Sequence, residues 1–377
     1  MDARRKYTPL LALAVTACAF EEALVGDGPP GSPQSTPAWT LNELDSTAEA
    51  SLRGLAVVDE LVAWCGGSDG TLLRTTDGGR HWLPRPIPGA EDLDFRSLWA
   101  LDAQSAWTAS AGPGSASRIY HTSDGGQNWT LQHTNREPEG FFDAIAFWPG
   151  SAGQRGLVVG DPVAGHLTIL RTEDGGAHWE PLPSAAQPPS LPGEYAFAAS
   201  GTSLALVAPS TAWIVTGGSV ARMLRSTDGG TSWVAVPLPL GDGSEGAGAF
   251  SIATGDGVHG VVVGGNYREP ELAARHWART EDGGRSWSGP GGSGGAEGPE
   301  GPTGPAGYRS CVAVLPRTNH RTWIAVGPSG VDISDDGGRV WRSLRHQALN
   351  SVAWAPSGRR GFAVGPAGSL YRLEPVD

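Results

Sequence analysis

The sequence predicts an all-β chain folded as a propeller of seven blades, and three observations support this prediction. A motif of the form Asp-Gly-Gly-x-x-Trp occurs six times in the 377 residues. Its aspartates are spaced by 47, 50, 54, 54 and 54 residues, a period typical of propeller or solenoid arrays. Short apolar runs precede each copy, and helix signals are almost absent after residue 25.

Each repeat contains enough strand signals for one blade. In the third unit a run at 167–171 leads into the motif, which closes a tight turn and predicts a hairpin. Two more apolar runs, 144–147 and 156–160, lie upstream in the same unit. About four strands per repeat is the composition of a propeller blade.

The motif residues are predicted to be structural. The aspartate can accept hydrogen bonds from backbone N–H groups just ahead of it, the glycines supply backbone angles that a side chain resists, and the tryptophan offers apolar surface to the next sheet. The predicted structural residues are Asp77, Trp82, Asp124, Trp129, Asp174, Trp179, Asp228, Trp233, Asp282, Trp287, Asp336 and Trp341. Asp332, Asp335 and Asp336 lie close together, but the turn-closing role of Asp336 is favoured over a metal site, and no metal site is predicted.

The ends of the chain suggest how the ring closes. Apolar runs at 349–354, 361–365 and 369–373 form a seventh unit that lacks the motif and is one strand short. The segment 38–41 looks like the strand that follows the motif elsewhere, so we expect it to complete the last blade. Closure removes an unpaired sheet edge. A six-bladed ring is the alternative.

The N-terminus has the features of an export signal. Arg4-Arg5-Lys6 precedes a short apolar core, which predicts a signal peptide over residues 1–17. The segment ending at Cys18 resembles the lipobox of bacterial lipoproteins, which implies lipidation of Cys18; an ordinary cleaved signal is the alternative. Residues 18–37 would then form a flexible tether and 38–377 the propeller. The expected location is the cell envelope, periplasmic or outer-surface, with membrane contact only through the lipid anchor.

Charge and composition disfavour one class of partner and predict two further features of the chain. The formal charge of −12 and the absence of a basic stripe disfavour nucleic acid. Cys65 and Cys311 fall in units that are not adjacent in a seven-bladed ring, so two buried thiols are expected rather than a disulfide. A Gly/Pro-rich stretch at 288–307 predicts a loop between the fifth and sixth blades.

The expected ligand site is the face opposite the motifs. Loops that lead into the innermost strands, and loops that join second and third strands, gather there around the channel, and they carry several charged and aromatic residues. The predicted ligand-binding residues are Arg53, Arg96, Asp143, Asp161, Glu194, Asn266, Tyr267, Arg268, Tyr308 and Arg309. They favour a protein or a polar or anionic ligand. The alternative is solvated loop residues with local ion pairs.

No enzyme motif supports chemistry, and no catalytic residue or cofactor is predicted. HExxH, P-loop and paired CxxC patterns are missing, and Gly291-Gly292-Ser293-Gly294-Gly295 matches GxSxG only in a glycine-rich loop.

The recurrent motif resembles the Asp-box, or bacterial neuraminidase repeat. Sialidases carry it, and that resemblance implies a carboxylate-binding set at Arg53, Arg96 and Arg309, with Tyr267 or Tyr308 beside a glutamate, Glu269 or Glu194. The Arg-Ile-Pro signature of that family is absent here. A sialidase-like glycoside hydrolase is therefore kept only as the alternative function.

The segments 73–82, 170–179 and 224–233 resemble more closely the repeats of photosystem II stability/assembly factor-like proteins. This resemblance implies an exported seven-bladed propeller that serves as a binding or assembly scaffold without catalysis.

Overall fold

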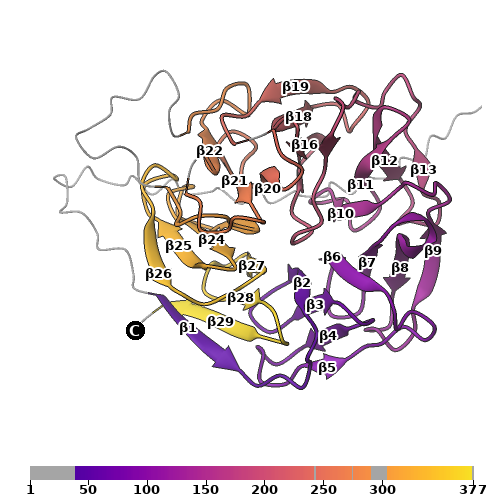
Figure 1. Cartoon of the computed structure of the whole chain (residues 1–377). Helices are drawn as coiled ribbons and strands as arrows, with labels where there is room; N and C mark the ends of the chain where they lie inside the picture. Colours follow the sequence, from indigo (N-terminus) through magenta and orange to yellow (C-terminus); the bar gives the residue numbers. More distant parts are fainter. Residues whose placement is uncertain (1–38, 242, 274, 290–303, 376–377) are drawn as a thin grey trace, which may run out of the picture. The chain divides into compact units, whose positions relative to one another are not determined.

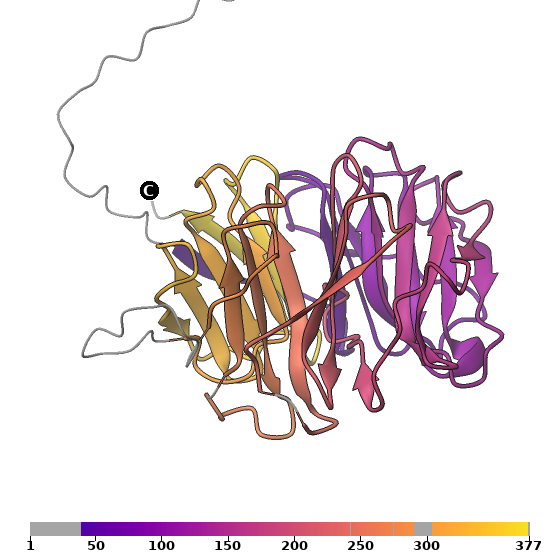
Figure 2. The same ribbon diagram turned by 90° about the horizontal axis from the view of Figure 1, so that it is seen from above.

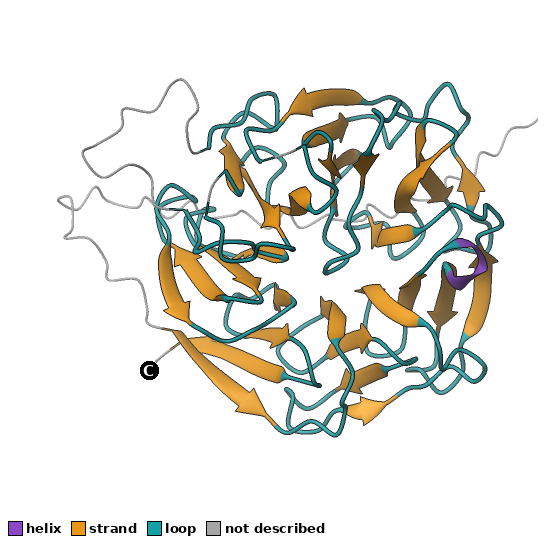
Figure 3. Ribbon diagram, in the orientation of Figure 1, coloured by secondary structure: helices purple, strands orange, loops and turns teal. Residues whose placement is uncertain are grey.

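The computed structural model describes residues 39–241, 243–273, 275–289 and 304–375. The predicted signal peptide, Cys18, the tether and most of the 288–307 loop lie outside the described residues. The described chain forms seven β-sheets arranged in sequence order around a common axis (Figure 1), and the sheets stand side by side when viewed from above (Figure 2). One turn of 3-10 helix, Gly114–Ala116, is the helical element within these ranges (Figure 3).

Four-stranded antiparallel sheets form the first three blades, numbered from the innermost strand outward. The first contains β2 (Leu52–Val57), β3 (Ala63–Gly67), β4 (Leu72–Thr75) and β5 (Leu83–Pro84). The second contains β6 (Asp94–Ala100), β7 (Ala106–Ala111), β8 (Arg118–Thr122) and β9 (Thr130–Thr134). The third contains β10 (Phe142–Phe147), β11 (Gly156–Val163), β12 (His166–Thr172) and β13 (Glu180–Pro181).

The fourth and sixth blades keep this pattern, whereas the fifth differs from it. The fourth contains β15 (Leu204–Val207), β16 (Thr211–Val215), β18 (Arg222–Ser226) and β19 (Val234–Pro237). The fifth contains β20 (Ala247–Thr254), β21 (Gly260–Asn266) and β22 (Trp277–Thr280), preceded by β14 (Glu194–Tyr195) and β17 (Gly217–Gly218). The sixth contains β23 (Cys311–Val314), β24 (Trp323–Gly327), β25 (Gly330–Ser334) and β26 (Arg342–Arg345). The outer edge of the fifth blade is a single bridge between Arg279 and Ser288.

The seventh blade closes the ring as the sequence predicts. It contains β27 (Ser351–Trp354), β28 (Gly361–Val364), β29 (Leu370–Pro375) and, outermost, β1 (Trp39–Leu44). β1 runs antiparallel to β29 with Leu41 opposite Leu373. The rings of Trp39 and Trp354 also meet edge to face, with centroids 4.9 Å apart. Seven blades are confirmed, and the six-bladed alternative is wrong.

Apolar cores lie between neighbouring blades. Trp82 of the first blade packs edge to face on Phe362 of the seventh, and the two belong to one buried cluster. Trp129 of the second blade meets Trp64 of the first in the same way. The tryptophan of the motif thus joins its own blade to the preceding one. Cys65 and Cys311 are free buried thiols in separate clusters, as expected.

The motif aspartates close the turns between third and fourth strands. Asp77 Oδ1 accepts the hydroxyl of Thr75 at 2.9 Å and the backbone N–H of His81 at 3.0 Å, while Thr75 Oγ1 accepts the N–H of Gly79. Gly78 and Gly79 have φ of 75° and 82°, a region that favours glycine. The aspartates of the other five turns accept the same two kinds of hydrogen bond from their own Thr or Ser and from the backbone ahead.

Candidate functional site

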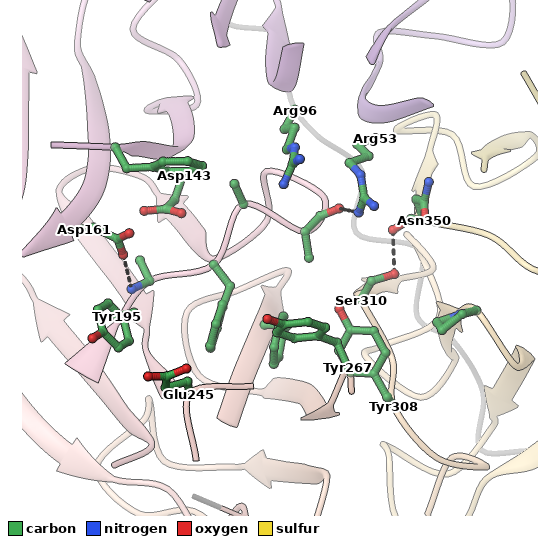
Figure 4. A pocket seen from close by; sticks show the side chains of 17 residues that line it. Arg53, Arg96, Asp143, Asp161, Tyr195, Glu245, Tyr267, Tyr308, Ser310 and Asn350 are labelled. Atoms are coloured by element: carbon green, nitrogen blue, oxygen red, sulfur yellow. Dashed lines mark hydrogen bonds between the residues drawn. The ribbon is translucent and has the colours of Figure 1, made fainter. Parts of the chain in front are cut away.

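A cavity of about 530 Å³ lies at the centre of the ring. Its polar wall residues come from strands of four blades and from the loops between blades, and Figure 4 shows them converging on one space. Because strands alternate in direction within a blade, the starts of innermost strands and the ends of second strands lie on one face, opposite the Asp-box turns. The cavity is therefore on the face predicted to carry the site.

β-Bulges aim several of these side chains. In β2 the pairing with β3 shifts between Leu52 and Gly54, which leaves Arg53 as the extra residue. The same shift isolates Arg96 in β6 and Asp143 in β10. A bulge redirects its unpaired residue away from the regular alternation of the sheet. Three blades thereby turn a charged side chain into the cavity at equivalent positions.

Two further bulges contribute to the same cavity. The pairing of β11 with β12 shifts at Asp161, and the pairing of β20 with β21 shifts at Phe250. Asp161 comes from the third blade, like Asp143, so two carboxylates of one sheet meet here. Figure 4 shows them on the same side of the cavity, with Arg53 at the other end.

Asp143 and Asp161 form an acidic pair in the cavity wall. Asp143 is buried, and its Oδ2 has no hydrogen-bond partner among the described residues. Burial raises the pKa of Asp143, the Asp161 charge raises it further, and Arg96 opposes the increase. Burial also raises the pKa of Asp161 to about 7, although its Oδ1 accepts the N–H of Ala196 at 3.1 Å. Both carboxyl groups are therefore harder to ionise here than in water.

Arg53 and Arg96 form the cationic part. Burial, followed by the charge of Arg96, lowers the pKa of Arg53. Arg53 Nη1 donates to the carbonyl oxygen of Ala199, and Arg96 Nε donates to Asp94 Oδ2 at 2.7 Å. Two neighbouring guanidinium groups, partly removed from water, favour an anion between them because it would offset their mutual repulsion.

A segment that sequence reasoning missed crosses the cavity. Residues 195–203 run from β14 to the innermost strand of the fourth blade and contact three other blades on the way. The N–H of Ala196 reaches Asp161, the carbonyl of Ala199 accepts from Arg53, and Ser200 Oγ donates to the carbonyl of Ser310 at 2.8 Å. The step between the third and fourth motifs is 54 residues, the same as the two steps that follow, so neither the spacing nor the composition indicated this path.

Aromatic rings form the remaining wall. Phe197 of the crossing segment stacks on Phe250, with centroids 3.9 Å apart, and Tyr308 meets Phe250 edge to face. Tyr308 is buried, and that burial raises the pKa of its phenol. Tyr267 and Tyr195 are 47% and 38% exposed, so both rings are available to a ligand.

Six of the ten predicted ligand-binding residues line the cavity. These are Arg53, Arg96, Asp143, Asp161, Tyr267 and Tyr308. The structure adds Glu245, Phe250, Ser310 and Tyr195, which were not in the predicted set. Phe250 occupies the same bulge position as the two arginines, and aligning the fifth unit with the others would have found it.

Two predicted residues are instead held in ion pairs. Arg309 is fully buried, and its Nε donates to Asp332 at 2.6 Å. Asp332, considered above as part of an acidic group, is thereby satisfied as a partner of Arg309. Glu194 is buried as well, and accepts hydrogen bonds from Arg222 at 2.8 Å and from the Thr216 hydroxyl at 2.6 Å. Arg309 and Glu194 do not line the cavity, because each is neutralised by an ion pair within its own neighbourhood.

The last two predicted residues, Asn266 and Arg268, lie beside the cavity and do not line it. Asn266 Oδ1 accepts the backbone N–H of Arg268, which stabilises the local turn. Arg268 forms an exposed ion pair with Glu245 at 3.1 Å and lies over the ring of Tyr267. Arg268 therefore contacts two residues of the cavity wall without lining it.

The arrangement does not favour the sialidase alternative. That reading requires Arg53, Arg96 and Arg309 to converge, and Arg309 is occupied by Asp332. It also requires Tyr267 or Tyr308 beside Glu269 or Glu194, whereas Glu194 is committed to Arg222. Two arginines remain in the cavity, with a tyrosine that is exposed and one that is buried.

Comparison with known proteins agrees with the architecture. Residues 32–152 match the family model described as photosynthesis system II assembly factor YCF48. The chain is an Asp-box propeller that resembles photosystem II assembly factors. The photosystem II assembly lipoprotein Ycf48 of Synechococcus sp. (strain CC9902) is 26% identical over 147 residues, which cover 39% of this chain and 40% of that protein.

Two further relatives extend this comparison. The chloroplastic photosystem II stability/assembly factor HCF136 of Oryza sativa subsp. japonica is 36% identical over 66 residues, 17% of this chain and 15% of that protein. The chain thus matches less than half the length of these curated relatives. A solved structure described as YCF48 bound to D1 peptide superposes with a TM-score of 0.60 at 16% identity, covering 91% of this chain and 98% of that one. At that identity the superposition shows the fold. No helix among the described residues is long and apolar enough to cross a membrane.

Proposed function

We propose that this protein is a non-enzymatic, exported scaffold that binds a polypeptide segment through a carboxylate group in the central cavity. The observation that carries the proposal is the pairing of Arg53 and Arg96, turned inward by equivalent bulges and partly removed from water. A peptide carboxylate placed between them would gain two charge-assisted hydrogen-bonding partners. The exposed rings of Tyr195 and Tyr267 provide apolar contact beside that anchor.

The comparisons support a protein ligand. One structural neighbour is described as bound to a D1 peptide, and the curated relatives are photosystem II assembly proteins. A rigid ring that holds loops from several blades around one cavity binds by preorganisation, because few groups lose freedom when the ligand enters. The polypeptide that this protein binds need not be a photosystem component. The cavity residues require only that the ligand carry a carboxylate with apolar side chains near it.

We also propose that the mature protein is held at the cell envelope by a lipid on Cys18. The basic n-region, the short apolar core and Cys18 support this, as does the relative described as a lipoprotein. Residues 18–37 would connect the anchor to the ring. Replacing Cys18 with serine should release the protein from the membrane fraction, and mass spectrometry of the intact chain would identify the lipid. Equal membrane association of Cys18→Ser and wild type would argue against lipidation.

Peptide arrays test the binding proposal. Each short peptide is presented with a free C-terminus, with an amidated C-terminus, and with its acidic residues changed to amides. We expect binding to require a carboxylate, and Arg96→Gln or Arg53→Gln to weaken it about 10-fold or more, the loss expected for a charge-assisted contact. Arg80→Gln is the matched control, because Arg80 is exposed on the Asp-box face. Equal affinity of Arg96→Gln and wild type for all peptides would contradict the proposal.

A further inference from the structure

A second cluster of potential ligand groups lies away from the cavity, between the fifth and sixth blades. Asp256 and His259 lie in the loop between β20 and β21, and His320 lies in the loop between β23 and β24. Both loops join first and second strands, so they are on the Asp-box face. One carboxylate oxygen and one nitrogen of each imidazole lie within 4.8 Å of one another.

Both imidazoles place Nδ1 near the same carboxylate oxygen. His259 Nδ1 lies 2.8 Å from Asp256 Oδ2, and His320 Nδ1 lies 3.5 Å from the same oxygen. The two imidazole rings are parallel within 10°, with centroids 5.3 Å apart. In a tetrahedral zinc site with bonds of about 2.0–2.1 Å, ligand atoms lie roughly 3.3 Å apart. The two separations from Asp256 Oδ2 lie on either side of that value. One imidazole ring would rotate out of the parallel arrangement so that both nitrogens point at the same ion.

The backbone holds each group in place. Asp256 Oδ1 accepts the N–H groups of Val258 and His259, both at 2.8 Å, which leaves Oδ2 directed at the two imidazoles. His320 has a φ of 57°, and its carbonyl oxygen accepts the indole N–H of Trp323 at 2.7 Å. A Cβ at Gly255 would lie 2.8 Å from His320 Nε2, so a larger residue there would force the His320 ring to shift.

A comparison within the chain separates this cluster from ordinary His–Asp contacts. His81 and His178 also place Nδ1 close to the carboxylates of Asp77 and Asp174, at 2.6 and 2.7 Å. Those pairs belong to single Asp-box turns, and neither is among the described groups of three potential metal ligands. At Asp256 a second imidazole arrives from the next blade. A hydrogen bond of the Asp-box type accounts for His259 but not for the orientation of His320.

We infer that Asp256, His259 and His320 form a binding site for a late divalent transition metal, with Zn²⁺ as the expected occupant. Two imidazoles and one carboxylate are suitable zinc ligands, and the fourth position would be taken by water because the side chains are 31%, 45% and 26% exposed. The ion would join the loops of the fifth and sixth blades on the face opposite the cavity. This inference is independent of the proposed peptide binding.

Metal titration of the purified, untagged protein tests the site. Calorimetry with Zn²⁺ should give one ion per chain, and Co²⁺ should show the intense visible bands of four-coordinate geometry. At a free Zn²⁺ concentration about 100 times the dissociation constant, the midpoint of thermal unfolding should rise by roughly 3–5 °C. The absence of saturable binding by either ion would overturn the inference.

Variants assign the binding to these residues. His320→Ala and His259→Ala should each abolish the stoichiometric binding and the visible Co²⁺ bands, whereas His178→Ala, which removes a two-ligand His–Asp pair, should retain both. His320→Gln serves as a second test if His320→Ala unfolds, because glutamine preserves much of the side-chain volume. Binding that persists in folded His320 and His259 variants, or that is lost in His178→Ala, would overturn the assignment.

Discussion

Arg53 in the first blade donates a hydrogen bond from Nη1 to the carbonyl oxygen of Ala199, 3.0 Å away and 146 residues further along the chain. The bond ties the crossing segment 195–203 to the arginine that we place in the ligand site. The cavity therefore has a wall that is held partly by one of its own binding groups. A ligand that recruits Arg53 and a loss of Arg53 should both affect the order of this segment.

Replacing Arg53 with methionine should loosen the crossing segment. Methionine keeps an unbranched apolar stem but lacks the guanidinium donors, and we expect a loss of about 1–2 kcal/mol in unfolding free energy. Hydrogen exchange should accelerate at residues 196–203. Arg85→Met is the control, since Arg85 Nε donates to the carbonyl of Gly125 in another part of the ring. Faster exchange in that segment for both variants would mean that the effect is not local.

The acidic pair predicts a fall in stability between mildly acidic and mildly alkaline pH. The folded-state pKa of Asp161 is raised to about 7, so its stabilising contribution is present below the ordinary pKa and is lost as the pH rises through about 7. Asp161→Asn should weaken this dependence, of which buried Asp143 keeps a part, and should be more stable than wild type at about pH 8, by roughly 1–3 kcal/mol. Urea unfolding at about pH 5 and about pH 8 measures both effects. An unchanged pH dependence in Asp161→Asn would assign it to another group.

The Asp-box turns have the opposite dependence on pH. Hydrogen bonds from Ser286 and Thr280 outweigh burial, the largest single influence, and lower the pKa of Asp282 to about 2. Its contribution is therefore present above the unfolded value near 4 and lost as the pH falls through about 2. Asp282→Ala should lower the free energy of unfolding by about 1–2 kcal/mol at neutral pH. Asp92→Ala, a control at an exposed position, should leave it nearly unchanged. Thermal or urea unfolding gives the difference, and equal stability of the two variants would argue against a turn-closing role.

The buried ion pair of the sixth blade should matter for stability and not for ligand binding. Asp332→Leu leaves the guanidinium of Arg309 buried without its partner, and we expect a loss of about 3–5 kcal/mol. The double variant Arg309→Met with Asp332→Leu should recover part of that loss, because no uncompensated charge remains. Peptide affinity of the folded double variant should equal that of wild type. A large loss of peptide affinity would indicate that Arg309 takes part in ligand binding.

Closure of the ring depends on β1. Leu41 is buried in the cluster that includes Leu373, and truncation to alanine should cost about 2–4 kcal/mol. Limited proteolysis should then cleave first within or next to β1. Asn42→Ala, an exposed position on the same strand, is the matched control and should resist proteolysis like wild type. Identical digestion of Leu41→Ala and wild type would show that β1 is held by other contacts.

The sequence alone was sufficient for the architecture. The Asp-box turn is made by residues within a few positions of one another. A local motif such as Asp77, Gly78 and Trp82 therefore predicts the turn without any knowledge of the tertiary structure. The regular spacing of these turns predicted the blades, and the missing strand of the seventh unit predicted that β1 would complete it. These features are local or periodic, so the order of residues along the chain is enough to predict them.

The cavity was decided by the tertiary structure. Arg96 and Arg309 look equivalent in the aligned repeats, but Arg96 lies in a β-bulge of β6, whereas Arg309 precedes β23, whose pairing with β24 is regular. The bulge turns Arg96 inward, while Arg309 meets Asp332 across the sixth blade. The path of residues 195–203 and the meeting of His259 with His320 depend likewise on contacts between blades. Side-chain direction and pairing across blades are set by packing of the whole ring, because residues far apart in sequence supply the partners.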